Sequence, residues 1–321
     1  MPMEHRPWRF IYVTDMQPGS PKSYRFRPAF LDNWKTALRQ IIELAPEFVL
    51  VGGDVARDGT LHRWELEEMK SDFESINAPY YVVPGNMDAG NKRTSIEGPD
   101  PNRRDLEIGI SSNLIGQFES VFGPSHWSFV HKNVRVSGFC DMLLGSGLPE
   151  ERELKSWLEL ERAVQRNNPG GEHRVWLMHY PLFVDSPGER EWDITKSDEY
   201  HSWYFTVDFN HRQWLLDFFK ETHTERVITG HIHCRKDHVA EGIHFDLAPG
   251  TGFSQWNDHW PDGDPTLGFY QFDVTDRGMH RTFVELDPVS TRTDGYGPGG
   301  HPTEEMRDYS LAWEPINGAD W

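Results

Sequence analysis

A chain of 321 residues with 37% hydrophobic and 13% aromatic content can bury a substantial core, and we expect one large domain. Its 51 acidic and 32 basic residues give a formal charge of -19, which repels polyanions and argues against nucleic acid as a partner. Two cysteines, Cys140 and Cys234, imply no disulfide framework; with no visible signal peptide or run of about 18 apolar residues, we expect a soluble cytoplasmic protein that engages no membrane.

Strands and helices are expected to alternate in the first part of the chain. Three short apolar runs bounded by polar or glycine-rich turns are typical of buried strands: Phe10–Val13, Phe48–Val51 and Tyr80–Val83. Between them, apolar residues recur at helical spacing from Leu31 to Ile42 and from Leu66 to Ile76. The predicted order is strand, helix, strand, helix, strand.

The alternation continues before the helices stop and strands alone remain. Helices are expected at Ser111–Phe122, Pro149–Val164 and around Trp214–Phe219. The expected strands are Trp127–Val130, Val134–Phe139, Arg174–Met178, Arg226–Thr229, Val239–Leu247, Phe269–Val274 and His280–Leu286. This mix indicates an α/β (α+β) protein with two packed sheets flanked by helices.

Three stretches interrupt this pattern. Gly90–Arg104 and Asp185–Asp208 are polar or rich in Gly and Pro, and both follow motif loops, where substrate-binding loops usually lie. The stretch Asp287–Trp321 has too little periodicity for regular structure. We therefore expect a domain over residues 1–286 and an extension over 287–321 that packs on the surface or is partly disordered.

Polar segments follow five of the expected strands. Open α/β sheets place their sites at the carboxyl ends of strands, so these segments should converge. Their carboxylates, amides and histidines suit Mn, Fe, Zn or Mg rather than a thiolate site. The segments are Thr14–Gln17, Gly52–Asp54, Gly85–Asp88, Met178–Pro181 and Gly230–His233.

The order and residue types of these segments resemble the calcineurin-like metallophosphoesterase family. Its pattern is Asp-x-His, Gly-Asp, Gly-Asn-His-Asp, a lone His and Gly-His-x-His, and the resemblance extends from Phe10 to about Leu286. It implies a four-layer sandwich of two mixed β-sheets between helices. Single pieces of this pattern occur by chance, but all five in order make a specific signal.

The resemblance also implies a role for each matching residue. Asp15 and His233 would hold a first metal ion, and Asp54 would bridge to a second. The remaining ligands of the second ion would be Asn86, His179 and His231. Two such cations clamp a phosphate ester and activate a bridging hydroxide for attack on phosphorus.

The implied activity is hydrolysis of a phosphomonoester or phosphodiester. The substrate would be a small-molecule phosphate ester or a phosphoprotein, and two divalent or trivalent ions would be the cofactors. The residues expected to take part in catalysis are Asp54, Asn86, Asp88 and His179. The glycines before Asp54, Asn86 and His231 are expected to allow tight backbone turns.

Two positions depart from the family pattern. Gln17 replaces a histidine, and its carbonyl oxygen either ligates the first metal or accepts a hydrogen bond from a metal-bound water. Met87 replaces the histidine that in the family contacts the phosphate and is thought to protonate the leaving group. A thioether has no proton to donate, and general acid catalysis contributes about 10² to 10⁴-fold, so aryl esters should be the least impaired substrates.

Several other residues have both a functional and a structural interpretation. Substitutes for the missing acid could be His62, His126 or His259, each of which could equally pack or lie on the surface. Asp88 either supports catalysis or caps the following loop. Tyr180 and Cys234 fit packing better than function. An aromatic rim that binds substrate could be formed by Trp203, Tyr204, Trp256 and Trp260, which could instead simply pack. An anionic group of the substrate could be bound by Arg93, Arg103 and Arg104, which could instead be solvated on the surface.

Met87 also motivates a rival function. A chain that keeps the metal ligands but lacks the acid could be a metal- and phosphate-binding regulatory protein with little or no turnover.

Overall fold

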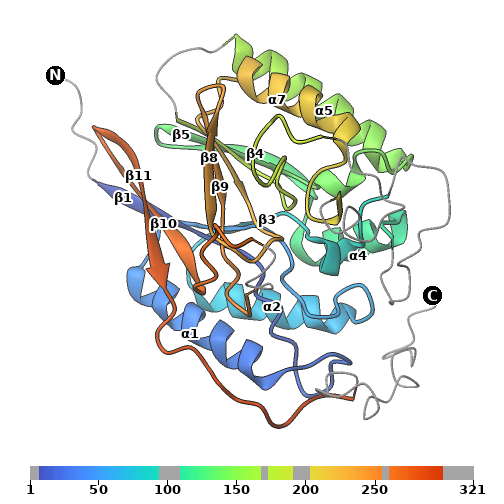
Figure 1. Ribbon diagram of the computed structural model, residues 1–321, viewed down its shortest axis with the longest axis vertical. Helices are drawn as coiled ribbons and strands as arrows, with labels where there is room; N and C mark the ends of the chain where they lie inside the picture. The colour runs from blue at the N-terminus through green and yellow to red at the C-terminus, as the bar shows by residue number, and fades with distance from the viewer. Residues whose placement is uncertain (1–6, 94–108, 168–172, 191–202, 255–259, 299–321) are drawn as a thin grey trace.

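A computed structural model describes residues 7–93, 109–167, 173–190, 203–254 and 260–298 (Figure 1). Its helices are α1 (Pro28–Leu44), α2 (Arg63–Ser75), α3 (Asn86–Ala89), α4 (Ser112–Phe122), the 3-10 turn η1 (Asp141–Leu143), α5 (Pro149–Arg166) and α7 (Phe209–Glu221). Its strands are β1 (Trp8–Val13), β2 (Val49–Val51), β3 (Tyr80–Val82), β4 (His126–His131), β5 (Val134–Phe139), β6 (His173–Leu177), β7 (Arg226–Thr229), β8 (Lys236–Ala240), β9 (Ile243–Leu247), β10 (Gly268–Thr275) and β11 (Gly278–Glu285).

The strands form two sheets. The first has the order β11-β10-β1-β2-β3, in which β1, β2 and β3 are parallel and β10 and β11 are antiparallel to their neighbours. The second has the order β4-β5-β6-β7-β9-β8, with a parallel centre and an antiparallel strand at each edge. Both sheets are therefore mixed, as expected.

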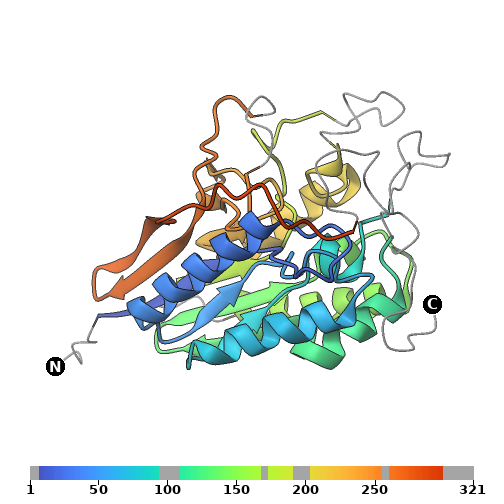
Figure 2. The same cartoon turned by 90° about the horizontal axis from the view of Figure 1, so that it is seen from below.

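Alternation along β1 explains why the first sheet is covered on both faces. Phe10 and Tyr12 belong to a buried cluster that also contains Val175 and Leu177 of the second sheet, so these side chains lie between the two sheets. Ile11 and Val13 point the other way and pack with residues of α1 and α2. Figures 1 and 2 show these two helices along the outer face of the sheet.

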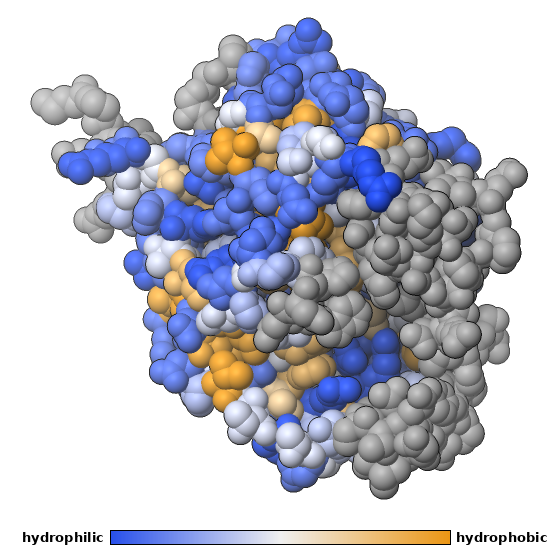
Figure 3. Space-filling model, viewed as in Figure 1, coloured by the Kyte–Doolittle hydropathy of each residue, from blue (hydrophilic) through white to orange (hydrophobic). Residues whose placement is uncertain are grey.

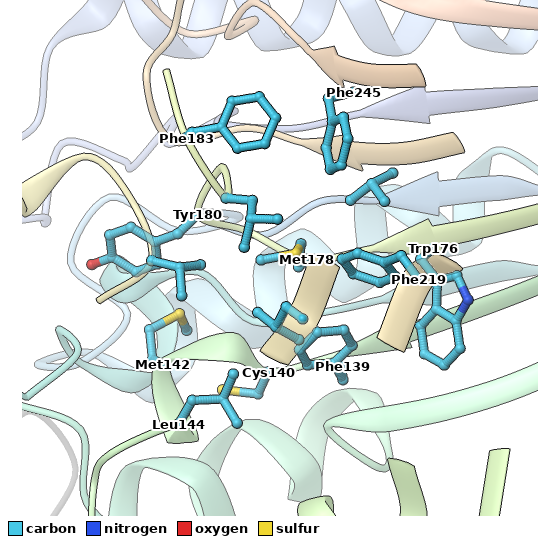
Figure 4. Packing of buried hydrophobic residues seen from close by; sticks show 14 of the residues in the cluster. Phe139, Cys140, Met142, Leu144, Trp176, Met178, Tyr180, Phe183, Phe219 and Phe245 are labelled. Atoms are coloured by element: carbon cyan, nitrogen blue, oxygen red, sulfur yellow. The ribbon is translucent and has the colours of Figure 1, made fainter. Parts of the chain in front are cut away.

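The second sheet follows the same rule. Trp176 and Met178 point away from the sheet interface and pack among residues of α5 and α7, including Phe219 (Figure 4). Trp176 meets the ring of Phe218 edge-on, with 5.0 Å between ring centroids. The layers are thus helix, sheet, sheet and helix, which confirms the predicted four-layer sandwich.

Most predicted elements agree with the structure to within a few residues, but the stretch Val239–Leu247 was wrong as a single strand. It is a hairpin of β8 and β9 joined at Glu241 and Gly242, whose φ angles are 53° and 80°. Two successive left-handed residues match the twist of a tight hairpin turn. A glutamate at the first of them hides this signal in the sequence.

The segment after β11 crosses the surface beside α1. The backbone N–H of Ser290 donates to Asn33 Oδ1 at 2.7 Å, and the backbone N–H of Gly297 donates to the carbonyl of Phe26 at 3.3 Å. Residues 287–298 therefore lie on the domain surface. The division of the chain at residue 286 stays a prediction, and residues 299–321 lie outside the described part.

The described surface in Figure 3 is mostly hydrophilic, with apolar residues in small separate groups. No helix among the described residues combines the length and the apolar composition that a membrane crossing needs.

Candidate metal centre

The five motif segments converge, as predicted from their positions after strands. They follow β1, β2, β3, β6 and β7, each of which runs parallel to a neighbouring strand of its sheet. Backbone hydrogen bonds join neighbouring segments: Asp15 N–H donates to the carbonyl of Gly53 at 3.0 Å, and Gly230 N–H donates to the carbonyl of His179 at 3.0 Å. The predicted ligands Asp15, Asp54 and His179 are buried in the middle of this arrangement.

Positive φ angles occur at several of the candidate ligands. Asp15, Gln17, Asp54, His231 and His233 have φ angles of 53°, 39°, 50°, 68° and 47°. Left-handed backbone at residues other than glycine is uncommon and persists where the surrounding structure enforces it, often at functional sites. Five of the ten described non-glycine residues with positive φ are thus residues that the sequence motifs single out.

The glycines before the ligands were expected to allow tight backbone turns, but two of the three are needed for another reason. Gly53 does adopt a positive φ of 93° before Asp54, but Gly85 and Gly230 do not. A Cβ atom on Gly85 would lie 2.2 Å from Asp54 Oδ1, and one on Gly230 would lie 2.3 Å from Asp15 Oδ2. Any side chain at these two positions would fill the space of the carboxylates, so close approach and not backbone freedom requires glycine.

Asp15, Asp54 and His233 form the first group of possible ligands. His233 Nε2 lies 3.1 Å from Asp15 Oδ1. The contact lacks hydrogen-bond geometry, and Asp15 Oδ1 has no hydrogen-bond partner among the described residues although it is buried. The other oxygen, Oδ2, accepts from Thr14 Oγ1 at 2.8 Å and from the backbone N–H of His231 at 2.9 Å.

Asp54, His179 and His231 form the second group, and Asn86 lies next to it. His179 Nε2 is 3.1 Å from Asn86 Oδ1 and 3.4 Å from Asp54 Oδ1. Asp54 belongs to both groups, which is the geometry required of a bridging ligand. The division of ligands between two ions is therefore compatible with the arrangement of side chains.

Each candidate histidine has one ring nitrogen engaged by a backbone carbonyl. His179 Nδ1 lies 2.8 Å from the Gly52 oxygen, and His233 Nδ1 lies 2.9 Å from the Phe253 oxygen. His231 Nε2 lies 3.3 Å from the Tyr204 oxygen. Such a bond fixes the neutral tautomer and directs the other nitrogen toward a metal, as is usual for metal-ligating histidines.

The donor set and its spacing fit small hard or borderline cations. Two ligand atoms at about 2.1 Å from one cation lie about 3.0 Å apart at an octahedral angle and about 3.4 Å apart at a tetrahedral angle. The separations between His233 and Asp15, and between His179 and its two neighbours, fall in this range. The unpartnered oxygen of Asp15 is also explained by a cation.

The pKa values reflect the same concentration of charge. Burial lowers the pKa of His179, but the carboxylates of Asp54, Asp15 and Asp141 outweigh it and raise that pKa to about 10. Burial raises the pKa of Asp15, yet His233 and His179 hold it below its usual value. A proton on His179 thus offsets the negative charge of these carboxylates, as a bound cation would.

Gln17 lies between Asp54 and an arginine that sequence reasoning missed. Its Nε2 donates to Asp54 Oδ2 at 2.5 Å, and its Oε1 accepts from Arg57 Nη1 at 3.1 Å. Because a guanidinium only donates, the carbonyl of Gln17 must face Arg57 and its amide must face Asp54. In this orientation Gln17 holds the carboxylate of Asp54; its predicted role as a metal ligand stays a prediction.

Met87 and Asp88 lie in the short helix α3. The Met87 side chain is partly exposed, and its backbone N–H donates to Asp54 Oδ1 at 2.8 Å. Asp88 is fully buried and accepts backbone N–H bonds from Gly85, Val55 and Ala56 at 2.9 to 3.2 Å. Burial and the neighbouring Asp54 raise the pKa of Asp88 to about 7. Asp88 therefore ties together the loops that carry Asp54 and Asn86, as the capping interpretation expects.

Asp141 is a second residue that sequence reasoning missed. Its Oδ1 accepts from the backbone N–H of His179 at 2.8 Å, and its Oδ2 accepts from that of Tyr180 at 3.1 Å. Its place two residues after the end of β5, at the same edge of the sheet as the motif segments, was the available signal. Asp141 positions the loop that presents His179.

In the described part of the chain, no hydrogen bond joins His62 or His126 to Met87, and both rings pack against tryptophans. His62 is buried and stacks on Trp64, with 5.4 Å between ring centroids, and His126 packs on Trp157 at 5.0 Å. His259 lies outside the described residues. Arg25 does contact the Met87 side chain, and its Nη2 lies 3.8 Å from Met87 Sδ.

The remaining candidates divide between packing and the site. Trp203 covers the buried amine of Lys92, and Trp260 packs edge-on against Phe205 at 4.8 Å. The exception is Tyr204, whose hydroxyl accepts from Asn86 Nδ2 at 3.3 Å. Cys234 belongs to the core, as does Tyr180, whose hydroxyl points away from the packed rings in Figure 4.

Of the loop arginines, only Arg93 lies in the described part of the chain. Arg93 donates to the backbone carbonyls of Ser146 and Ile110, which indicates a structural role. Trp256, Arg103 and Arg104 lie outside the described residues.

Comparison with known families gives the class that this fold and site define. The model of the calcineurin-like phosphoesterase family matches residues 9–235, most of the chain. The chain belongs to this family of metal-dependent phosphoesterases.

Individual relatives agree with the assignment. The chain is 26% identical over 312 residues to the serine/threonine-protein phosphatase CPPED1 of Danio rerio, covering 89% of this chain and 87% of the relative. Two solved structures share the fold: a dimetal phosphatase from Danio rerio, with TM-score 0.55, 13% identity and coverage of 87% and 99%, and the purple acid phosphatase PPD1 of yellow lupin, with TM-score 0.60 and 14% identity. The match covers 91% of this chain and 54% of the lupin enzyme.

Proposed function

We propose that this protein hydrolyses a phosphomonoester or phosphodiester with two bound metal ions. In this proposal Asp15 and His233 hold one ion, and Asp54 bridges. The ligands of the other ion are Asn86, His179 and His231. Gln17 would orient the bridging carboxylate or ligate the first ion, and Asp88 would support the Asp54 and Asn86 loops.

One observation carries the proposal. The candidate ligand atoms of His233 and Asp15, and of His179 and Asn86, lie 3.1 Å apart in a buried site, with each histidine oriented by a backbone carbonyl. Packing alone gives no reason for three buried histidines each to direct one ring nitrogen toward buried carboxylates. Coordination of a shared cation gives that reason.

Bound ions would neutralise the phosphoryl oxygens and allow a water molecule to act as the nucleophile near neutral pH. The residues of the chain would bind and orient these groups. Asn86 Nδ2 donates a hydrogen bond to the hydroxyl of Tyr204, and these two side chains would line one side of the substrate site. Asp54 accepts from Met87 N–H and from Gln17 Nε2, so both of its oxygens are held in place before substrate binds.

The substrate class follows from charge and from the relatives. CPPED1 is named a serine/threonine-protein phosphatase, which makes a phosphoprotein or a small phosphate ester a suitable substrate for this chain. The formal charge of -19 disfavours nucleic acid. Cytoplasmic location stays a prediction.

The test is hydrolysis of p-nitrophenyl phosphate and bis(p-nitrophenyl) phosphate by metal-depleted protein to which Mn²⁺, Fe²⁺, Zn²⁺ or Mg²⁺ is returned. We expect activity that requires metal and falls to background in Asp54→Ala. His244→Ala, an exposed histidine on β9, is the matched control and should retain activity. Absence of hydrolysis by protein with metal content confirmed would contradict the proposal.

The rival function, phosphate binding with little turnover, is motivated by Met87. It predicts tight binding of inorganic phosphate to the metal-loaded protein without hydrolysis, and no gain in Met87→His. A gain of about 10²-fold or more on an alkyl phosphate in Met87→His would favour the hydrolase, because general acid catalysis contributes about 10² to 10⁴-fold.

A further inference from the structure

The side-chain amine of Lys92 is buried against backbone and aromatic groups. Lys92 lies in the loop after α3 and is only 7% exposed. Its Nζ donates to the backbone carbonyl of Trp203 at 2.5 Å and also to that of Thr206. The same atom lies 4.1 Å from the ring centroid of Trp203 and 5.3 Å from that of Tyr180. The amine therefore joins the loop after α3 to a segment 111 residues further along the chain.

Burial of this amine is unfavourable in itself. It lowers the pKa of Lys92 to about 7, although the carboxylate of Asp208 acts in the opposite direction. Lysine is among the residue types least often fully buried, and an ordinary link between two loops does not need one. A buried lysine that bonds two backbone carbonyls thus indicates that the position of this backbone matters.

The far end of the same segment has an anchor of its own. Arg212 Nη2 donates to Thr206 Oγ1 at 2.6 Å, and Arg212 Nε donates to the carbonyl of Val207 at 3.1 Å. The two bonds of Lys92 have a different place in the segment, because the carbonyls that they reach belong to the residues on either side of Tyr204.

Tyr204 connects this segment to the second group of candidate ligands. Its backbone carbonyl lies 3.3 Å from His231 Nε2, and its hydroxyl accepts from Asn86 Nδ2 at 3.3 Å. When Nε2 carries the proton and donates to this carbonyl, Nδ1 keeps its lone pair for a cation. The position of the Tyr204 carbonyl therefore decides which nitrogen of His231 is available to a metal ion.

The residue before Lys92 reinforces this arrangement. Asn91 Oδ1 accepts from the hydroxyls of Tyr180 and Tyr204, both at 3.4 Å. The rings of these two tyrosines pack against the imidazole of His231, with centroid separations of 4.0 and 5.2 Å. Asn91 and Lys92 thus hold side chains and main chain around His231 from one short loop.

We propose that Lys92 is a positioning residue that fixes the Tyr204 carbonyl and thereby leaves His231 Nδ1 to bind the second metal ion. This inference rests on the metal centre of the proposed function for its effect on metal binding, but not for the bond between His231 and Tyr204. The first ion should be less dependent on Lys92, because the carbonyl of Phe253 orients His233.

The experiment begins with Lys92→Met, which keeps the length of the side chain but removes its donors, and Lys92→Ala, which leaves room for an added amine. Lys35→Met, at an exposed lysine on α1, is the matched control. Ile41→Ala removes a buried side chain on α1 and controls for loss of stability alone. Thermal midpoints are recorded throughout, and Lys92→Gln, which keeps an N–H donor, is used should Lys92→Met fail to fold.

Nitrogen-15 NMR of the histidine side chains in metal-free protein at pH 8 reads the tautomer of His231, with His231→Ala to assign its signals. We expect the proton on Nε2 in the wild type and in both α1 variants, and a mixture of tautomers in Lys92→Met. Propylamine added to Lys92→Ala should restore the wild-type signal, because it can place an ammonium group between the same two carbonyls.

Calorimetric titration with Mn²⁺ reads the effect on the metal sites one at a time. In His233→Ala, which retains the second site, adding Lys92→Met should weaken Mn²⁺ binding about 10- to 100-fold, as loss of a residue that positions a metal ligand typically does. In His231→Ala, which retains the first site, the same addition should leave the Mn²⁺ affinity unchanged.

A His231 tautomer in folded Lys92→Met that matches the wild type would overturn the proposal. Equal losses of Mn²⁺ affinity in the two histidine backgrounds would also overturn it, as would the same changes in Ile41→Ala, because both outcomes indicate a general loss of structure. If the wild type binds no metal, the proposed function fails, and the NMR measurement still decides whether Lys92 positions His231.

Discussion

Loading the candidate centre with Mn²⁺ is expected to raise the thermal midpoint of this protein in two separable steps. The centre contains the buried carboxylates of Asp15 and Asp54, and Asp15 Oδ1 has no hydrogen-bond partner among the described residues. A cation that binds the folded chain and not the unfolded one stabilises the fold in proportion to its free concentration relative to Kd.

The size of the shift follows from chain length. Unfolding entropy is about 2.1 cal/mol/K per residue, so 321 residues correspond to about 0.67 kcal/mol/K. One site at 100 times its Kd contributes about 2.7 kcal/mol. Each occupied site should therefore raise Tm by about 4 °C, and two sites by about 8 °C.

Differential scanning calorimetry of chelator-treated protein, with and without Mn²⁺, measures this shift. His233→Ala removes a ligand of one site only and should retain about 4 °C, whereas the exposed control His244→Ala should retain the full shift. A wild-type shift below about 1 °C at saturating metal would refute the two-metal reasoning. Equal shifts in the two histidine variants would refute the assignment of His233.

Two further predictions concern groups that support the site. Asp141→Asn leaves one acceptor for the two backbone N–H groups of His179 and Tyr180. Loss of a residue that positions a metal ligand typically weakens metal binding, so the affinity for Mn²⁺, measured by calorimetric titration, should fall about 10- to 100-fold. Unchanged affinity would argue against this positioning role. Glu65 has a pKa of about 8 in the folded protein against an ordinary 4.5, so the folded state binds the extra proton between these values and stability should fall as pH rises from about 5 to 8. Glu65→Gln removes this dependence and should be more stable than wild type by up to a few kcal/mol at pH 8 but not at pH 5, measured by urea unfolding. An equal difference at both pH values would show that Glu65 does not titrate in this range.

Much of the fold was predictable because its signals are local. The short stretches Val134–Phe139 and Arg226–Thr229 carry β-branched and aromatic residues between polar turns, and the predicted ranges agree with the structure. The β8–β9 hairpin was not predictable in this way, because its turn places Glu241 in a left-handed conformation that its residue type does not signal.

The identities and order of the candidate ligands were also legible in the sequence. A ligand such as Asp15 or His231 lies two residues after the end of a strand, and parallel strands bring their carboxyl ends to one edge of a sheet. Residue type and distance from the strand end are both properties of a short segment.

Only the tertiary structure revealed what surrounds those ligands. Arg25 meets Met87 across 62 positions of sequence, and Asp141 meets His179 across 38. The backbone carbonyls of Gly52, Tyr204 and Phe253 that orient the histidines belong to residues whose type carries no trace of that role. A sequence determines by itself which chemical groups follow each strand; which distant groups then meet them depends on how the loops pack, and no local pattern encodes that.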